Sequence, residues 1–214
     1  MHEYKLYVEL LSDTCFGRGD GIGGVVNSEV EHDAHTGLPF IKGSTIKGLL
    51  VEACADLLYG LQLSGAPDFS DTAQKLFGRP GSTHEEQGLL HIGNATLPQA
   101  FQQQVQASSY SPSQILNAMT AIRYQTAVDP STDKPLDTSL RATRVVLRET
   151  TFVAPLISRQ ELSDDAYVFL CACVATVRRG GLNRSRGLGR LKLYIDSSET
   201  MQQQLAAFSR DIGD

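Results

Sequence analysis

The chain has 214 residues, a formal net charge of -5 at pH 7 and a hydrophobic fraction of 41%. This fraction is too high for a disordered chain, and the longest apolar run, 167–177, is far below the ~20 residues that cross a bilayer. The amino terminus lacks the cleavage site of a signal peptide, and the four cysteines lack the spacing of a zinc site or a disulfide framework. We therefore expect one soluble, cytoplasmic domain over residues 1–214, without a membrane segment, cofactor or bound metal.

Eight segments have the residue patterns of regular secondary structure. Period-two alternation predicts strands, whereas apolar residues three and four apart predict helices. In chain order these are a strand (4–11), a helix that begins at Ser44 or Thr45 and ends near Tyr59, a helical turn (73–77), strands (89–97 and 150–157), a helix (164–178), a strand (190–195) and a terminal helix (199–209). This order predicts an α+β fold with a ferredoxin-like or RRM-like βαββαβ core.

The middle of the chain departs from this core. Residues 98–121 are rich in Gln and Ser, and we expect an exposed insertion with one short helix. Residues 122–149 have DPSTDKPLD at their centre, and the extended arms around this turn predict a projecting hairpin, or thumb. Basic residues cluster on the second arm at Arg141, Arg144 and Arg148, which indicates a positively charged face.

The most basic segment is RRGGLNRSRGLGRLKL, residues 178–193. Six of its sixteen residues are Lys or Arg, none is acidic and four are glycines. Glycines let backbone amides approach a phosphate, and arginines donate paired hydrogen bonds to its oxygens. The segment therefore predicts a grip on a phosphate backbone, the alternative being an exposed turn that is merely basic. The residues expected to make these contacts are Arg184, Ser185, Arg186, Gly187, Gly189 and Arg190.

A second cluster of donors lies in LPFIKGSTIKGLL, residues 38–50. Free N–H groups and the dipole at a helix N-terminus attract anions. The segment lacks the spacing of a Walker A loop. It predicts a second phosphate contact, the alternative being an ordinary capped helix with solvated lysines. The donors expected there are Lys42, Gly43, Ser44, Thr45 and Lys47.

Three other motifs have weaker support. The letters G-x-G-x-x-G occur at 19–24 after a strand, but the β-branched residues that follow do not begin a helix, so we expect no dinucleotide site. The sequence His-Asp-Ala-His at 32–35 has no further ligands at metal-binding spacing. No G-x-S-x-G motif supports a hydrolase.

Several segments together resemble the RAMP superfamily of CRISPR proteins, which are RRM-like modules that bind CRISPR RNA. GLPFIKGSTIKGLL is similar to the family's P-x-I-P-G-S-S-L-K-G helix start, with Lys42 where proline is usual. KLFGRPG followed by GLLHIGNATL is similar to its LFG segment, with Asn94 in place of an aspartate. GGLNRSRGLGRLKL matches the family's glycine-rich loop. The stretch 125–152 is similar to the thumb of type III backbone subunits, especially those of subtype III-D.

The resemblance implies a function and a set of partners. It implies that the loop, the helix start and the thumb arginines Arg141 and Arg144 contact a guide RNA. The partners would be CRISPR RNA, complementary target RNA and other subunits of a CRISPR effector complex. Backbone contacts suit such a subunit because base pairing reads the sequence. Both a repeated backbone subunit and the cap that holds the guide's 5′ handle are consistent with this resemblance.

The resemblance also bears on catalysis. Relatives that cleave target RNA carry an aspartate in the loop after the first strand, and Asn27 aligns with it. Because an amide cannot act as a general base, we expect no nuclease activity, with Asp20 as the alternative carboxylate. Two other functions stay open. One is a CRISPR RNA-processing endoribonuclease that uses His32, His35 or Lys47. The other is an RRM-type protein unconnected with CRISPR. Such a protein stacks bases on aromatic residues of its strands, and the segments RLKLYI and LLHIGNATL do not supply that aromatic pattern.

Overall fold

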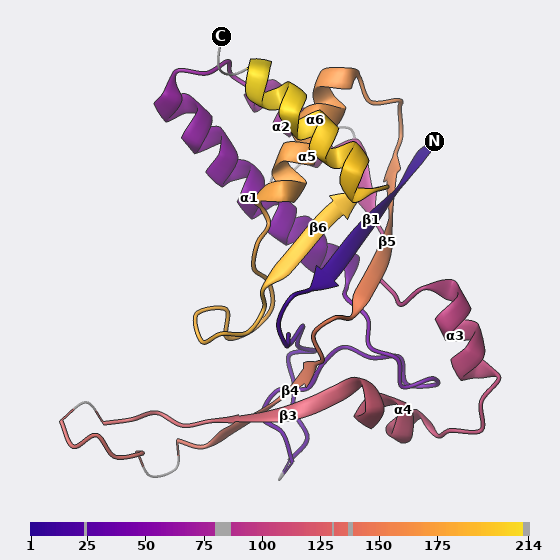
Figure 1. Cartoon of the computed structure of the whole chain (residues 1–214), viewed down its shortest axis with the longest axis vertical. Coiled ribbons are helices and arrows are strands. Elements are labelled where there is room, and N and C mark those ends of the chain that lie inside the picture. Colours follow the sequence, from indigo (N-terminus) through magenta and orange to yellow (C-terminus); the bar gives the residue numbers. More distant parts are fainter. Residues whose placement is uncertain (24, 80–86, 130, 137–138, 212–214) are drawn as a thin grey trace.

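A four-stranded antiparallel sheet forms the centre of the molecule (Figure 1). The computed structural model describes residues 1–23, 25–79, 87–129, 131–136 and 139–211. The sheet order is β2-β5-β1-β6, and the strands are β1 (His2–Leu10), β2 (Leu90–Ile92), β5 (Thr151–Ser158) and β6 (Leu191–Ile195). The amino-terminal strand β1 thus lies in the interior of the sheet, between β5 and β6. The expected α+β fold is confirmed.

The strands alternate between a buried and a partly exposed face. In β1, Leu6, Val8 and Leu10 are buried, whereas the residues between them are only partly buried. The same alternation runs through β5. The helices α1 (Gly43–Ser64) and α5 (Asp164–Thr176) cover the apolar face of the sheet (Figure 1). The element order is therefore β-α-β-β-α-β once the other helices and the hairpin are set aside.

Helix α5 is buried on nearly every side, as its uniformly apolar sequence predicts. All residues from Phe169 to Val174 are buried, because α5 packs against the sheet and between α1 and α6 (Ser198–Asp211). Ser163 caps the start of α5 by accepting a hydrogen bond from the Ala166 N–H at 3.3 Å, a contact worth about 1 kcal/mol. None of the helices in the described ranges is long and apolar enough to span a membrane.

Several elements differ in length from the expectation, and three of them bear on the core. Helix α1 continues more than a turn beyond Tyr59, and its C-cap is Gly65, whose φ of 74° is left-handed. Helix α2 (Ser70–Phe77) has eight residues rather than a single turn. Strand β2 has three residues, so most of the expected strand 89–97 lies outside regular structure.

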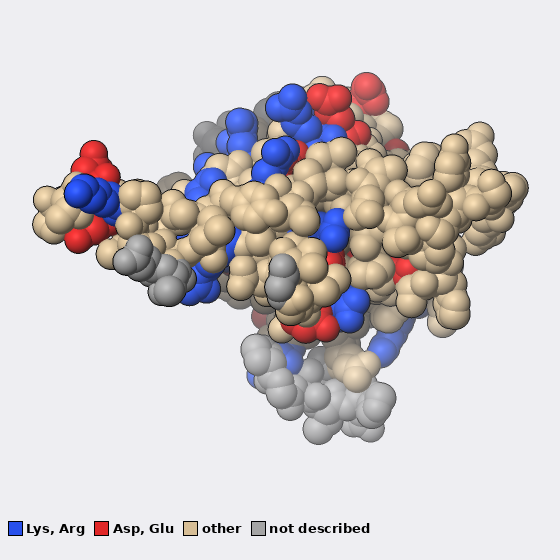
Figure 2. Space-filling view, turned by 90° about the horizontal axis from the view of Figure 1, so that it is seen from below, with Lys and Arg blue, Asp and Glu red and all other residues tan. Residues whose placement is uncertain are grey.

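The insertion after β2 contains two helices instead of the one expected. These are α3 (Gln99–Gln106) and α4 (Pro112–Met119). Ser111 begins α4 with a capping box, in which its side chain and that of Gln114 each bond to the other residue's backbone N–H. No Asp, Glu, Lys or Arg occurs from 87 to 122, and Figure 2 shows the largely uncharged end of the molecule that results.

Strands β3 (Thr120–Gln125) and β4 (Arg141–Val146) form the predicted hairpin, which projects away from the sheet (Figure 1). The base of β4 is joined to the loop after β1, because Val146 and Thr14 exchange two backbone hydrogen bonds of 2.8 and 3.0 Å. Some positions of predicted features lie outside the described residues, namely Pro130, Asp137 and Thr138 of the hairpin, Gly24 of the G-x-G-x-x-G letters and Pro80 and Gly81 of KLFGRPG.

Candidate nucleic-acid interface

The glycine-rich loop between α5 and β6 is held against the loop that follows β1. Gly180 donates its N–H to the Gly189 carbonyl at 2.9 Å, which closes the loop, and Leu182 donates to the Cys15 carbonyl at 2.8 Å. The φ of Gly189 is 74°, and a Cβ there would lie 2.1 Å from the Gly180 carbonyl oxygen. Only glycine tolerates both conditions. This glycine therefore sets the shape of the loop.

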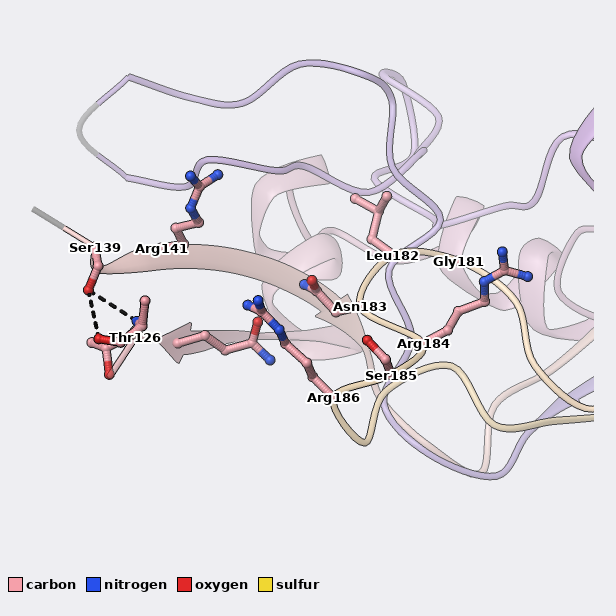
Figure 3. Close-up of a pocket in the computed structure, with 11 residues that line it drawn as sticks. Thr126, Ser139, Arg141, Gly181, Leu182, Asn183, Arg184, Ser185 and Arg186 are labelled. Carbon is pink, nitrogen blue, oxygen red and sulfur yellow. Dashed lines mark hydrogen bonds between the residues drawn. The ribbon is translucent and has the colours of Figure 1, made fainter. Parts of the chain in front are cut away.

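A groove separates this loop from the part of the hairpin where the β3–β4 pairing ends, at Gln125 and Arg141 (Figure 3). Its larger hollow has a volume of about 760 Å³ and is lined by Gln125, Thr126, Ala127, Ser139, Arg141, Gly181, Leu182, Asn183, Arg184, Ser185 and Arg186. A smaller hollow of about 270 Å³ is lined by Asn27, Ser28, Gln125, Arg141, Thr143, Leu182, Asn183 and Arg186. Because five residues line both hollows, we treat the two as one groove.

The groove is positively charged. Arg141 comes from the hairpin wall and Arg186 from the loop wall (Figure 3). Neither forms an ion pair within the described part of the chain, and none of the described lining residues is Asp or Glu. Seen from below, Lys and Arg side chains gather where the hairpin meets the body (Figure 2). Since guanidinium groups bind phosphate oxygens through paired hydrogen bonds, the groove suits a phosphate backbone.

Arg184 differs from its neighbour Arg186. Its guanidinium pairs with Glu52 of α1 at 3.2 Å, and Figure 3 shows it turned away from the hairpin. The two side chains are 45% and 57% exposed, so this pair contributes little to stability. In the free protein, the predicted phosphate-binding residue Arg184 is therefore paired with the carboxylate of Glu52.

The remaining predicted loop residues separate into two groups. Ser185 lines the groove, and Gly187 and Arg190 are exposed outside its described lining. Gly189 is buried, so it acts through the backbone shape described above rather than through contact with a ligand.

The start of α1 does not present all the donors that the sequence predicts. The Lys42 ammonium pairs with the Glu31 carboxylate. The Gly43 N–H, which would otherwise face an anion, donates to Asn94 Oδ1 at 3.0 Å. Gly43 is buried, and a Cβ there would lie 2.1 Å from the Ile92 carbonyl oxygen. Gly43 therefore permits close packing of α1 on β2, which is a structural role.

Neither Ser44 nor Thr45 caps α1, so that prediction is wrong. The N-cap is Lys42, whose side chain accepts no cap hydrogen bond. Asn94, from a distant segment, supplies the acceptor for the Gly43 N–H instead. Ser44 and Thr45 are exposed, and Lys47 is partly buried. None of these residues belongs to the described lining of the groove.

Arg144 lies in the interior, which corrects the prediction that it contacts RNA. It is 8% exposed, and its Nε lies 2.9 Å from the carboxylate of Glu29, which is 1% exposed. Its Nη1 donates to Asn117 Oδ1 and Thr120 Oγ1, both at 3.1 Å. The guanidinium therefore joins β4 to α4 and to the loop after β1.

Asn27 and Asp20 occupy different places in the loop after β1. Asn27 Oδ1 accepts a hydrogen bond from the Ala142 N–H at 2.7 Å, which places Asn27 at the edge of the groove. The Asp20 carboxylate pairs with Arg18 at 3.1 Å and is 57% exposed. Asp20 is absent from the described lining of the groove.

Residues 32–35 form a turn of their own. Asp33 Oδ1 accepts hydrogen bonds from the N–H groups of Thr36 and His35 at 2.8 and 3.0 Å. These bonds, with that from Thr36 the strongest, hold the pKa of Asp33 below its ordinary value. His32 Nδ1 contacts the Val30 carbonyl oxygen at 2.9 Å. Within the described ranges, no three His, Cys, Asp or Glu residues gather where a metal ion can bind.

Sequence reasoning missed the uncharged lining of the groove, chiefly Gln125, Thr126 and Asn183. Gln125 and Thr126 carry no charge and sit in an ordinary extended arm, so nothing local distinguishes them. Asn183 did have a signal, because it lies inside the basic glycine-rich loop. An asparagine there can take the left-handed conformation that its φ of 58° requires.

The chain is similar to known proteins in sequence and in structure. One relative, the CRISPR system Cmr endoribonuclease Cmr4 of Pyrococcus furiosus (strain ATCC 43587 / DSM 3638 / JCM 8422 / Vc1), is 32% identical over 98 residues, which are 45% of this chain and 30% of that protein. The match thus spans less than a third of the relative's length.

Two solved structures of the type III-B Cmr-beta complex contain chains of the same fold. The complex bound to cognate target RNA gives a TM-score of 0.64 at 12% identity, with 96% of this chain and 99% of that chain covered. The apo state gives 0.63 at 14% identity, with 92% and 98% covered. A family model described as the RAMP superfamily matches residues 7–192. The chain therefore belongs to the RAMP superfamily.

Proposed function

We propose that this chain binds guide RNA as a subunit of a type III CRISPR effector complex in the cytoplasm. The observation that carries the proposal is the groove, which has unpaired arginines on facing walls and no acid in its described lining. Membership of the RAMP superfamily and the likeness to type III-B chains support it. The partners would be CRISPR RNA, complementary target RNA and other effector subunits.

We propose a type III complex without assigning its subtype. The two solved structures described above are of type III-B complexes, whereas the thumb segment resembles subtype III-D. The groove serves either position in such a complex, a repeated backbone subunit or the cap on the guide's 5′ handle, because both positions require a grip on the RNA backbone.

We propose further that the chain has no nuclease activity of its own. The residue at the groove's edge is Asn27, whose amide cannot act as a general base. Asp20 lies outside the described lining and is paired with Arg18. No described carboxylate therefore faces an RNA held in the groove.

The name of the Pyrococcus furiosus relative, an endoribonuclease, favours a second candidate function. In this alternative the chain cleaves target RNA, with Asp20 as the carboxylate. Asp20 is exposed and lies on the same loop as Asn27, so movement of that loop on RNA binding would be required.

Copurification tests the first candidate. We would express the tagged chain with its neighbouring genes and a CRISPR array, and sequence the bound RNA. Guide-length RNA is expected. The double variant Arg141→Ala with Arg186→Ala should lower its yield by about tenfold or more, because the RNA loses two charge-assisted contacts. The matched control is Arg159→Ala. Arg159 follows the last residue of β5 and lies outside the described lining of the groove, so this change should leave the yield unchanged. An unchanged yield in the double variant would overturn the proposal.

Incubation with complementary RNA and Mg²⁺ separates the two candidates. The purified chain loaded with guide RNA should leave the target uncut. If cleavage occurs, and Asp20→Asn abolishes it while guide binding persists, the endoribonuclease is correct and the proposal of an inactive subunit is not.

A further inference from the structure

Uncharged polar side chains occupy the middle of the groove. Gln125, Arg141, Leu182, Asn183 and Arg186 line both hollows, so they mark the place where the hollows meet. Two of these five residues carry amides, one from the end of β3 and one from the glycine-rich loop. Gln125 and Asn183 therefore line the groove together with Arg141 and Arg186, one amide and one arginine from each wall.

These amides are not used by the protein itself. Neither side chain has a hydrogen-bond partner within the described part of the chain, and the same holds for Thr126 and Ser185 nearby. Ser139 differs, since its hydroxyl accepts a hydrogen bond from the Ala127 N–H at 3.1 Å (Figure 3) and donates to the Leu136 carbonyl at 2.7 Å, so it is held within the hairpin. Donors and acceptors thus stand free beside the unpaired arginines.

The described lining of the groove offers no aromatic ring on which a base can stack. Stacking on aromatic rings is the usual way in which proteins hold single-stranded bases. Tyr124 precedes Gln125 in β3 and is 64% exposed, but alternation along the strand puts the two on opposite faces. What the groove presents is charge for phosphates and amides for other polar groups.

We propose that this groove recognises the ribose of the RNA backbone, and that Gln125 and Asn183 select RNA over DNA by bonding to 2′-hydroxyls. The inference rests on the proposed function and deepens it. A 2′-hydroxyl is both donor and acceptor, and it is the group that distinguishes RNA from DNA at a given site. A side-chain amide also carries both a donor and an acceptor, so it can bond either way.

The left-handed backbone of Asn183 provides a clean variant. Its φ is 58°, a conformation that glycine adopts without strain. Asn183→Gly therefore removes the amide while it keeps the loop's path and the bond from the Arg186 N–H to the Asn183 carbonyl. Gln125→Ala is its counterpart on the hairpin wall.

Binding of three oligonucleotides of one sequence tests the inference. Single-stranded RNA, its DNA counterpart and its 2′-O-methyl form would be titrated against the full chain by fluorescence anisotropy. Each lost hydrogen bond should weaken binding roughly two- to tenfold. The wild type should prefer RNA over DNA and over the methylated RNA by roughly tenfold. In the variant Gln125→Ala with Asn183→Gly, RNA binding should fall to the level of DNA binding.

Three controls make the outcome decisive. Arg186→Ala should weaken RNA and DNA alike, because phosphate is common to both. Gln104→Ala, an exposed glutamine on α3, should change nothing. The methylated RNA needs no variant, so the test holds even if the double variant fails to fold.

The possible failures are distinguishable. Equal affinity of the wild type for all three oligonucleotides, or an RNA preference that survives in a folded double variant, overturns the ribose inference and leaves the proposed function intact. Absence of binding to any oligonucleotide at low salt overturns both.

Discussion

The groove and the start of α1 are two regions with similar sequence signals and different chemistry. Both concentrate basic residues, glycines and hydroxyls. In the groove, Arg141 and Arg186 have no carboxylate partner among the described residues. At the start of α1, Lys42 pairs with Glu31, and the Gly43 N–H is bonded to Asn94. A cation counted in the sequence is therefore not always a cation available to a ligand.

The difference has a physical cause in the distance between partners. Glu31 lies in the loop after β1, and Asn94 follows β2. Only the folded backbone brings these two residues to the start of α1. The groove escapes such pairing because the segments that form it carry no acid at the facing positions. Four predictions test this contrast.

The largest effect is expected at Arg144, which shares β4 with Arg141 but faces the interior. Arg144→Ala leaves the Glu29 carboxylate buried without its partner, and the free energy of unfolding should fall by about 3–5 kcal/mol. Urea denaturation measures this change. Replacing both members by methionine should recover most of the loss, since a hydrophobic pair of similar volume needs no charge partner. A double variant as unstable as the single one would contradict this account.

Arg186→Ala should have the largest effect on RNA affinity of any single change in the groove. The loss of a charge-assisted contact should weaken binding about tenfold and reduce the slope of log affinity against log salt by about one. Anisotropy titrations at several salt concentrations provide both values, and thermal unfolding should be unaltered because Arg186 is exposed. An unchanged salt slope would show that Arg186 meets no phosphate.

Lys42→Ala should change RNA affinity by less than about threefold, because the lysine is engaged by Glu31 on a partly exposed surface. Glu31→Gln in the same assay shows whether that pairing is the reason: it should raise the effect of a subsequent Lys42→Ala change. A tenfold loss from Lys42→Ala alone would make the start of α1 equal to the groove and would remove the contrast.

The smallest effect is expected from Glu52→Gln, and its sign is the informative part. Release of Arg184 should increase RNA affinity, by up to about threefold at low salt and not at all at high salt. Asp56→Asn removes an equal charge one turn further along α1 without touching Arg184, so it reports the general electrostatic effect alone. If both variants behave alike, Glu52 does not compete with RNA for Arg184.

Much of the fold was accessible from local pattern. The alternation in β1 and β5 and the uniformly apolar run in α5 each report burial directly, because a strand or helix exposes its residues with a fixed period. The position of the glycine-rich loop between α5 and β6 followed from the same pattern. The hairpin was also predictable, from extended arms around a turn.

The availability of each charged group was decided only by the tertiary structure. Arg141 and Arg144 lie three residues apart in one strand, so they point to opposite faces. Which face is buried depends on α4 and the loop after β1, which come from other parts of the chain. Gln125 and Asn183 likewise line one groove because the hairpin and the loop approach each other there. The local sequence determines which residues share a face of a strand or helix. Long-range packing determines whether that face meets the protein interior, a partner side chain or solvent.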